Sequence, residues 1–301
     1  MKHFTFFLTI SILFFLFLNN CCGETEFRKA GTFDIRLYGG TSSGSSYFDL
    51  NEKQMIKMSE KIENETPTKD YTVEFSELYF GIRAEYSVTD NFTVFGEIPL
   101  NSYNLLEKYL ADSLGYRSTR GDFSLLQTDY FAIGGRYLLY QKRTAFMAFY
   151  LEGRMPHRFY NGIQTDPDYQ FLSDGAFELI TGAMFGLKLE KMNFESSIFY
   201  NIRGEDLVDQ YIIHTKAGLS TVPGTELRLT IDFLQSTKSF KNAVPFDPRK
   251  TILQENNIKI GFGFNMMIDD AIYADFCYRI TPIGKNSWSL GTFYLACGVI
   301  F

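Results

Sequence analysis

Charged side chains occupy alternate positions within several apolar stretches of this 301-residue sequence. Successive side chains of a β-strand point to opposite faces, so charges at alternate positions share one face of the strand. Guanidinium and carboxylate groups on a shared face form charge-assisted hydrogen bonds and can line a polar passage. The candidate residues for such a passage are Arg83, Glu85, Glu97, Arg136, Glu152, Arg154, Lys188, Glu195, His214, Lys216, Arg228 and Asp232.

The strands that must position these charges are indicated by the apolar residues between them. Twelve alternating stretches follow residue 32, and the last of them runs through Phe293, Leu295, Cys297 and Val299 to Phe301. Each stretch is long enough for a tilted transmembrane strand of about nine to eleven residues. We therefore expect an all-β fold, a transmembrane antiparallel up-and-down β-barrel of about twelve strands. A soluble β-sandwich is the alternative, but its strands average about five or six residues.

The predicted connections alternate in length. Short turns are expected at residues 89–91, 141–144, 191–192, 222–224 and 269–270, several of which contain the Asn, Asp, Pro or Gly of tight hairpins. Longer polar loops are expected at residues 41–71, 101–124, 157–175, 204–208, 235–255 and 281–286. This alternation is typical of outer-membrane barrels, so we place the short turns and both termini on the periplasmic side.

The N-terminal residues predict export. An apolar run of about fifteen residues follows Lys2 and His3 and is too short to span a bilayer, so residues 1–23 are interpreted as a signal peptide and residues 24–301 as the barrel. The alternative is a lipoprotein modified on Cys21. Without the signal, 28 basic and 35 acidic residues remain, and this negative balance argues against nucleic acid as a partner.

Hairpin registers test the assignment of the inward face. Counting outward from the short turns places three acidic residues opposite basic or titratable ones: Arg83 opposite Glu97, Lys188 opposite Glu195, and His214 opposite Asp232. The same alternation directs Cys277 inward and Cys297 outward, so no disulfide is expected between them. The few cysteines and histidines lack metal-site spacing, and no metal or cofactor is predicted.

A twelve-stranded barrel should enclose a narrow lumen, because about eight strands are filled by side chains and sixteen or more leave an open channel. Mixed charges and aromatic rings on the inner face favour a channel for small hydrophobic or amphipathic solutes. The alternative is a closed structural or surface-recognition barrel that acts through its extracellular loops. If the barrel conducts, we expect its constriction at Arg83, Glu97, Arg136 and Glu152, which lie midway along adjacent strands.

Phospholipase chemistry is the enzymatic alternative, since some twelve-stranded outer-membrane barrels hydrolyse lipids with a His-x-Ser pattern on the outer face of a strand. Such chemistry needs a nucleophile, a histidine base and an orienting group within hydrogen-bond reach. Here Lys216 stands where the serine is required, and the alternation directs His214 inward. The pair of His214 and Asp232 is therefore interpreted as an ion pair of the lumen, and no catalytic residue is assigned.

Three segments resemble a family of outer-membrane transporters from phenol-degradation operons, which are fatty-acid-transporter-like porins. They are residues 84–100 (AEYSVTDNFTVFGEIPL), 129–139 (DYFAIGGRYLL) and 149–156 (FYLEGRMP). The resemblance implies a bacterial outer-membrane location and a small amphipathic solute, although His157 stands where the family has Thr-Gly. The terminal stretch is similar to the last strand of outer-membrane barrels, which implies that Phe301 is an assembly signal for the barrel-assembly machinery.

Overall fold

The computed structural model describes residues 28–60, 69–109, 119–128, 130–142, 144–156, 176–204, 207–240, 243, 254–269 and 271–301. The predicted signal peptide, Cys21, His157 and the expected loop at 157–175 lie outside the described residues. Within the described part of the chain, no helix is both long and apolar enough to cross a membrane.

The described residues form one antiparallel sheet of long strands. The strands are β1 (Phe33–Phe48), β2 (Gln54–Met55), β3 (Lys57–Glu60), β4 (Lys69–Thr89), β5 (Phe92–Tyr109), β6 (Thr119–Thr128), β7 (Tyr130–Lys142), β8 (Ala145–Pro156), β9 (Glu178–Lys188), β10 (Met192–Arg203), β11 (Gln210–Val222), β12 (Thr225–Ser236), β13 (Asn256–Met267), β14 (Ile272–Lys285) and β15 (Ser287–Ile300).

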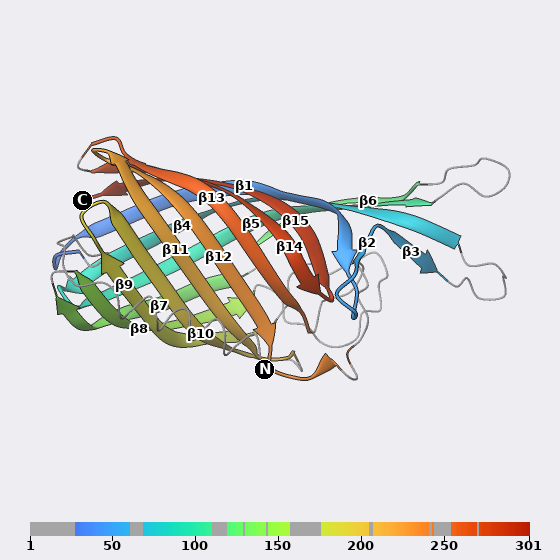
Figure 1. Ribbon diagram of the computed structural model, residues 1–301, viewed down its shortest axis with the longest axis horizontal. Helices are drawn as coiled ribbons and strands as arrows, with labels where there is room; N and C mark the ends of the chain where they lie inside the picture. Colours follow the sequence, from blue (N-terminus) through green and yellow to red (C-terminus); the bar gives the residue numbers. More distant parts are fainter. Residues whose placement is uncertain are drawn as a thin grey trace.

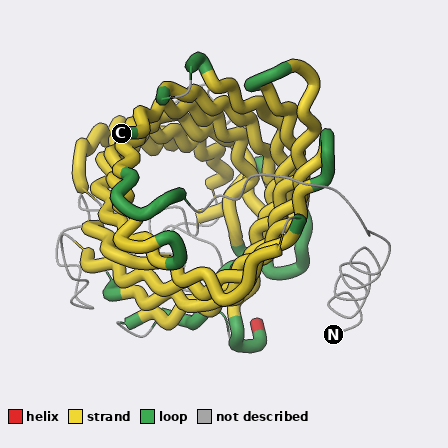
Figure 2. Tube along the Cα trace, turned by 90° about the vertical axis from the view of Figure 1, so that its left-hand side faces the viewer, coloured by secondary structure: helices red, strands yellow, loops and turns green. Residues whose placement is uncertain are grey.

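Twelve of these strands close into a barrel, as predicted (Figures 1 and 2). The order around the ring is β1, β4, β5, β7 and then β8 to β15, and each strand runs antiparallel to its neighbours. β1 pairs with β4 on one side and with β15 on the other, which completes the ring. A closed ring leaves no strand edge without a partner, and this is what allows a sheet to stand in lipid.

The first and last strands meet at Phe33 and Phe301. The backbone N–H of Phe33 donates to the carbonyl of Phe301 at 3.1 Å, and the N–H of Phe301 donates to the carbonyl of Phe33 at 2.8 Å. Their rings lie with centroids 6.5 Å apart. The strand that ends at Phe301 therefore closes the barrel against the first strand.

Large apolar side chains cover the outside of the barrel. Leu37 is 60 % exposed, Ile133 74 % and Phe262 59 %, and each was predicted to face outward. Burying such side chains in hydrocarbon is favourable by about 25 cal/mol per Å² of apolar surface, whereas exposing them to water would cost the same. The apolar exterior therefore identifies a surface that faces lipid.

The strands extend further than predicted at the end that carries the long connections. β1 continues to Phe48, β5 continues to Tyr109 and β14 continues to Lys285, so the loops expected at 41–71, 101–124 and 281–286 are wrong in large part. Polar sequence was interpreted as loop, yet a polar strand continues its hydrogen-bonded ladder beyond the membrane at no cost in lipid. The expected loop at 204–208 is confirmed, because β10 ends at Arg203 and β11 begins at Gln210.

An arm projects from this end of the barrel (Figure 1). It consists of β3, β6 and the outer parts of β4 and β5, with β3 paired to β4 and β6 paired to β5. The short turns lie at the opposite end, where they separate β4 from β5, β7 from β8, β9 from β10, β11 from β12 and β13 from β14. Gly224 occupies one of these turns with φ of +76°, a conformation that glycine adopts without steric cost.

Candidate functional site: the charged lumen

The inner face of the barrel carries the charges that the sequence placed there. Most of the predicted lumen residues form ion pairs with other described residues, and Lys188 lies across the ladder from Asn193. The strands hold these side chains because each charge alternates with a residue that faces lipid. The charges fall into two arcs of the wall: one begins on β4 and continues through Arg154 to Glu178 on β9 and Arg203 on β10, and the other is formed by the remaining charges of β10 to β14.

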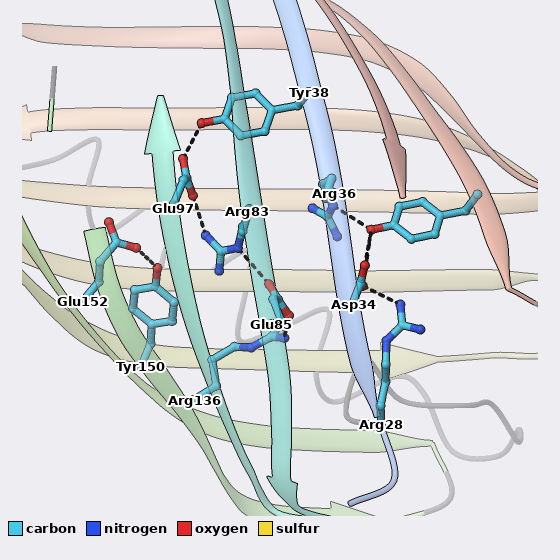
Figure 3. A network of polar contacts seen from close by, with 11 residues as sticks. Arg28, Asp34, Arg36, Tyr38, Arg83, Glu85, Glu97, Arg136, Tyr150 and Glu152 are labelled. Carbon is cyan, nitrogen blue, oxygen red and sulfur yellow. Dashed lines mark hydrogen bonds and ion pairs between the residues drawn. The ribbon is translucent and has the colours of Figure 1, made fainter. Parts of the chain in front are cut away.

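The first arc contains a continuous chain of four charges (Figure 3). Glu97 accepts a hydrogen bond from Arg83 Nη1 at 2.9 Å, and Arg83 Nε donates to Glu85 Oε1 at 2.8 Å. Arg136 Nη2 donates to the second oxygen of Glu85. The hydroxyl of Tyr38 on β1 donates to Glu97 at 2.8 Å. The predicted opposition of Arg83 and Glu97 is confirmed, because the two residues are direct cross-strand partners.

Aromatic rings connect this chain to a second group of charges. The guanidinium of Arg83 lies 3.9 Å from the centroid of Phe95, and Phe95 stacks on Tyr150 at 5.5 Å. The hydroxyl of Tyr150 donates to Glu152, which also accepts from Arg154 Nε at 2.5 Å. A cation over a ring face is attracted by the ring quadrupole, so the stack stabilises the position of Arg83.

The second arc contains three separate groups. Lys216 pairs with Glu195 at 2.7 Å. Arg228 pairs with Glu226 at 2.7 Å and with Asp275 at 2.9 Å. Asp232 contacts His214 and, at 3.4 Å, Arg279. Glu226, Asp275 and Arg279 are therefore added to the candidate lumen residues. His214 and Asp232 are cross-strand partners, as predicted, and both lie on the inner face. The predicted cross-strand contact between His214 and Asp232 is confirmed, and its role in the lumen stays a prediction.

One predicted register is wrong. Lys188 lies opposite Asn193, and Glu195 lies opposite Gly186. The turn between β9 and β10 has two residues, as assumed, but it lies one residue earlier, because the N–H of Leu189 bonds to the carbonyl of Met192 and leaves Glu190 and Lys191 as the turn. The slip amounts to two positions and therefore leaves both side chains on the inner face. Glu195 finds Lys216 on the other neighbouring strand instead.

A cavity of about 480 Å³ lies in the lumen toward the short-turn end. Three of the four residues expected at the constriction, Arg83, Glu97 and Arg136, line it, whereas Glu152 belongs to the neighbouring group. The cavity is also lined by four residues that were not among the predicted lumen residues, namely Arg28, Asp34, Arg36 and Tyr38. The signal for the last three was present, because they alternate with the outward residues of the first strand.

The two cysteines occupy opposite faces of adjacent strands. Cys277 is buried, Cys297 is exposed, and both are free thiols. Cys277 lies across the ladder from Tyr294, and Cys297 lies across it from Ala274. The expected absence of a disulfide between the two is confirmed by these positions.

The fold is similar to that of a solved bacterial outer-membrane channel. An outer-membrane channel from Pseudomonas putida F1 matches 94% of this chain over 100% of its own length, with a TM-score of 0.61 and 13% identity. The toluene transporter TodX of Pseudomonas putida covers 91% of this chain and 89% of its own length at a TM-score of 0.42 and 8% identity. The translocator domain of autotransporter NalP from Neisseria meningitidis covers 91% of this chain and 90% of its own length, with a TM-score of 0.42 and 7% identity.

These likenesses extend to architecture only, because the identities are low and the last two scores fall below 0.5. No protein-family model and no curated protein sequence matches the chain. The closed twelve-stranded ring and its apolar exterior give the chain the architecture of a bacterial outer-membrane barrel.

Proposed function

We propose that this protein is an outer-membrane channel for small hydrophobic or amphipathic solutes. The observation that carries the proposal is the cavity of about 480 Å³ inside a closed barrel, bounded by charged and aromatic side chains. The volume lies within the range of about 300–1,000 Å³ that is usual for small-molecule sites. The likeness in fold to the outer-membrane channel of Pseudomonas putida F1 agrees with this function.

The lining suits a solute with an apolar body and a polar group. Tyr38, Tyr273 and Tyr294 line the cavity together with the charged side chains, so a solute meets ring surface and hydrogen-bonding groups together. Most of the charges are already paired. The energetic barrier to passage of an uncharged solute is therefore lower than it would be beside unpaired charges. Conduction also requires binding that is weak enough for release, and several moderate contacts meet this requirement better than one strong site.

The experiment measures ion conductance and solute entry with the refolded protein. A planar bilayer recording is expected to show small conductance steps. In liposome swelling, phenyl β-glucoside, which crosses lipid slowly, is expected to enter faster than sucrose, because only the glucoside has an aromatic group. Absence of both conductance and swelling would contradict the channel function and favour the closed, surface-recognition barrel.

A double substitution tests whether the predicted residues line the passage. Arg83→Ala with Glu97→Ala removes two facing side chains together and changes no net charge, so the ion conductance should rise several-fold. The matched control is Ile133→Ala with Leu229→Ala, which shortens two side chains on the lipid face that are 74 % and 48 % exposed. An equal conductance in the two double variants would show that Arg83 and Glu97 do not restrict the passage.

A further inference from the structure

Two arginines face each other across the first strand pair of the barrel. Arg36 on β1 is the direct cross-strand partner of Arg83 on β4, and both side chains are on the inner face. Like charges placed directly opposite are destabilising in a sheet, so each needs compensation. Arg83 receives it from Glu85 and Glu97, whereas Arg36 has no such carboxylate partner.

Arg36 is held in place by an aromatic residue. Its Nε donates to the hydroxyl of Tyr273 at 2.8 Å, and its guanidinium carbon lies 5.4 Å from the centroid of the same ring. The Tyr273 hydroxyl in turn donates to Asp34 at 3.1 Å, and Asp34 also pairs with Arg28. Among the described residues, no carboxylate lies within 4.0 Å of the Arg36 guanidinium, and its two terminal nitrogens form no hydrogen bond.

The surroundings of these terminal nitrogens favour an anion. Five arginines and three carboxylates border the cavity: Arg28, Arg36, Arg83, Arg136, Arg228, Asp34, Glu85 and Glu97. Each of these arginines except Arg36 forms an ion pair with a carboxylate. The guanidinium fork has the geometry to bind a carboxylate through two parallel hydrogen bonds. The cavity therefore contains one guanidinium, that of Arg36, which forms no direct ion pair with a described carboxylate.

The same cavity provides a surface for a ring. Tyr38 and Tyr294 line it and stack on one another, with centroids 6.2 Å apart and planes inclined by 26°. Tyr38 lies two positions after Arg36 on the same face of β1, so the ring surface begins beside the guanidinium. A planar ligand can contact tyrosine rings while its anionic group reaches Arg36. The other four arginines of the lining already form ion pairs with carboxylates, so a ligand with one negative charge matches the one arginine that does not.

We propose that the short-turn half of the lumen binds a small aromatic monocarboxylate, with Arg36 as the anchor of its carboxylate and the Tyr38–Tyr294 pair as the surface for its ring. The inference rests on the proposed channel function for its biological use, because bound solute must be able to pass through the lumen. It narrows the solute class from amphipathic compounds in general to monoanions with a ring. It also makes Arg36, which was absent from the predicted set, the residue that determines specificity.

The test measures binding directly, so that it does not depend on transport. The refolded full chain in detergent micelles is titrated with 4-fluorobenzoate and followed by ¹⁹F NMR, with protein-free micelles as the reference. Arg36→Gln should weaken binding by about tenfold or more, since hydrogen bonds to a charged group are of that strength. Arg279→Gln is the matched control, because it removes an inward arginine that does not border the cavity, and it should change affinity less than twofold.

Two further ligands define the chemistry. 4-Fluorobenzyl alcohol lacks the charge and should show little saturable binding, and 4-fluorophenyl phosphate carries a second charge and should bind more weakly than the benzoate. Equal binding of the alcohol and the benzoate would overturn the carboxylate assignment. Stronger binding of the phosphate would overturn the preference for a monoanion. Equal losses in Arg36→Gln and Arg279→Gln would overturn the anchor role of Arg36.

A third variant keeps the inference testable if Arg36→Gln does not refold. Arg36→Lys retains the charge but lacks the fork, so it should bind the benzoate less tightly than the unaltered chain does. Unchanged affinity in Arg36→Lys would contradict a forked contact. The results separate this inference from the proposed channel function. Ion conductance without saturable benzoate binding would overturn only the inference. Saturable benzoate binding without conductance or solute entry would overturn only the channel function.

Discussion

The two charged arcs of the lumen hold similar residues in different arrangements. On β4 to β8, each inner charge of the chain from Glu97 to Arg136 touches the next, and aromatic rings extend the contact to Glu152. On β10 to β14, the charges form separate groups of two or three, such as Lys216 with Glu195. Among the described residues, neither Arg228 nor Arg279 lies over an aromatic ring.

This difference predicts how far the effect of a single substitution spreads. In the continuous arc a carboxylate such as Glu85 pairs with two arginines, so its loss removes an ion pair from each of them. In the divided arc Glu195 serves one lysine. A continuous network stabilises one arrangement of the wall more strongly, because its members are mutually dependent. The divided arc can lose one pair without a change in the others.

The largest effect is expected for Glu85→Gln. The change leaves Arg83 and Arg136 with less compensation beside Arg36, and removal of one partner from a buried ion pair costs about 3 kcal/mol. The free energy of unfolding, measured by urea titration of the refolded barrel, should fall by about that amount. Glu195→Gln is the matched control in the other arc and should cost only about 1 kcal/mol. Equal losses would refute the distinction between the arcs.

A smaller effect is expected for Tyr150→Phe. The ring remains stacked between Phe95 and Phe199, while the hydrogen bond from its hydroxyl to Glu152 is lost. A hydrogen bond to a charged group is worth about 1.5–3 kcal/mol, so the free energy of unfolding should fall by about 2 kcal/mol. Tyr200→Phe, which removes a hydroxyl bonded to Asp209 near the end of its strand, is the control and should lose less than half as much. A larger loss in Tyr200→Phe would show that the hydroxyl of Tyr150 is not part of a cooperative network.

A still smaller effect is expected for Asp232→Asn in the divided arc. Its partners His214 and Arg279 have side chains that are 37 % and 34 % exposed, so water can solvate them when the carboxylate is removed. The free energy of unfolding should fall by about 1 kcal/mol or less. The anion-to-cation permeability ratio, measured from the reversal potential in a salt gradient, should rise. A loss as large as that of Glu85→Gln would show that the divided arc is coupled as tightly as the continuous one.

The smallest change in stability is expected outside both arcs, for Phe301→Ala. The side chain is 70 % exposed, and the backbone hydrogen bonds to Phe33 do not require it, so the refolded barrel should lose about 0.5 kcal/mol. If Phe301 is an assembly signal, the amount of barrel inserted into the outer membrane of cells should nevertheless fall several-fold. Leu295→Ala, on the same face of the last strand, is the control for loss of an apolar side chain. Equal amounts of inserted protein for the two variants would refute the signal.

The fold could be predicted because its constraints are local. Alternation alone determines which side chains face lipid, and residues such as Leu37 and Ile133 lie where that rule puts them. The lengths of the strands beyond the membrane could not be predicted in this way. Polar residues after Thr41 and after Thr281 can form a strand or a loop equally well by composition, and the choice depends on pairing with a distant strand.

The sequence could predict which side chains lie on the inner face, but it could not predict all of their contact partners. Arg83 and Glu97 were paired correctly because their hairpin turn is short. The partner of Glu195 was predicted wrongly because the position of its turn depends on backbone hydrogen bonds that residue types do not determine. The alternation of the first strand places Arg36 on the inner face, but its contact with Tyr273 joins residues separated by 237 positions and could not be predicted. Such contacts arise from closure of the ring and have no local signal.

The contact between Arg36 and Tyr273 crosses the seam at which β1 meets the last strands of the chain. A pocket built across a seam is absent until the final hydrogen-bonded ladder has formed. A ligand that occupies it binds the closed ring and not an open precursor, so it should shift the equilibrium toward closure by mass action. A bound solute would then stabilise the closed barrel, and an increase in the free energy of unfolding on addition of ligand would show that the ring is complete.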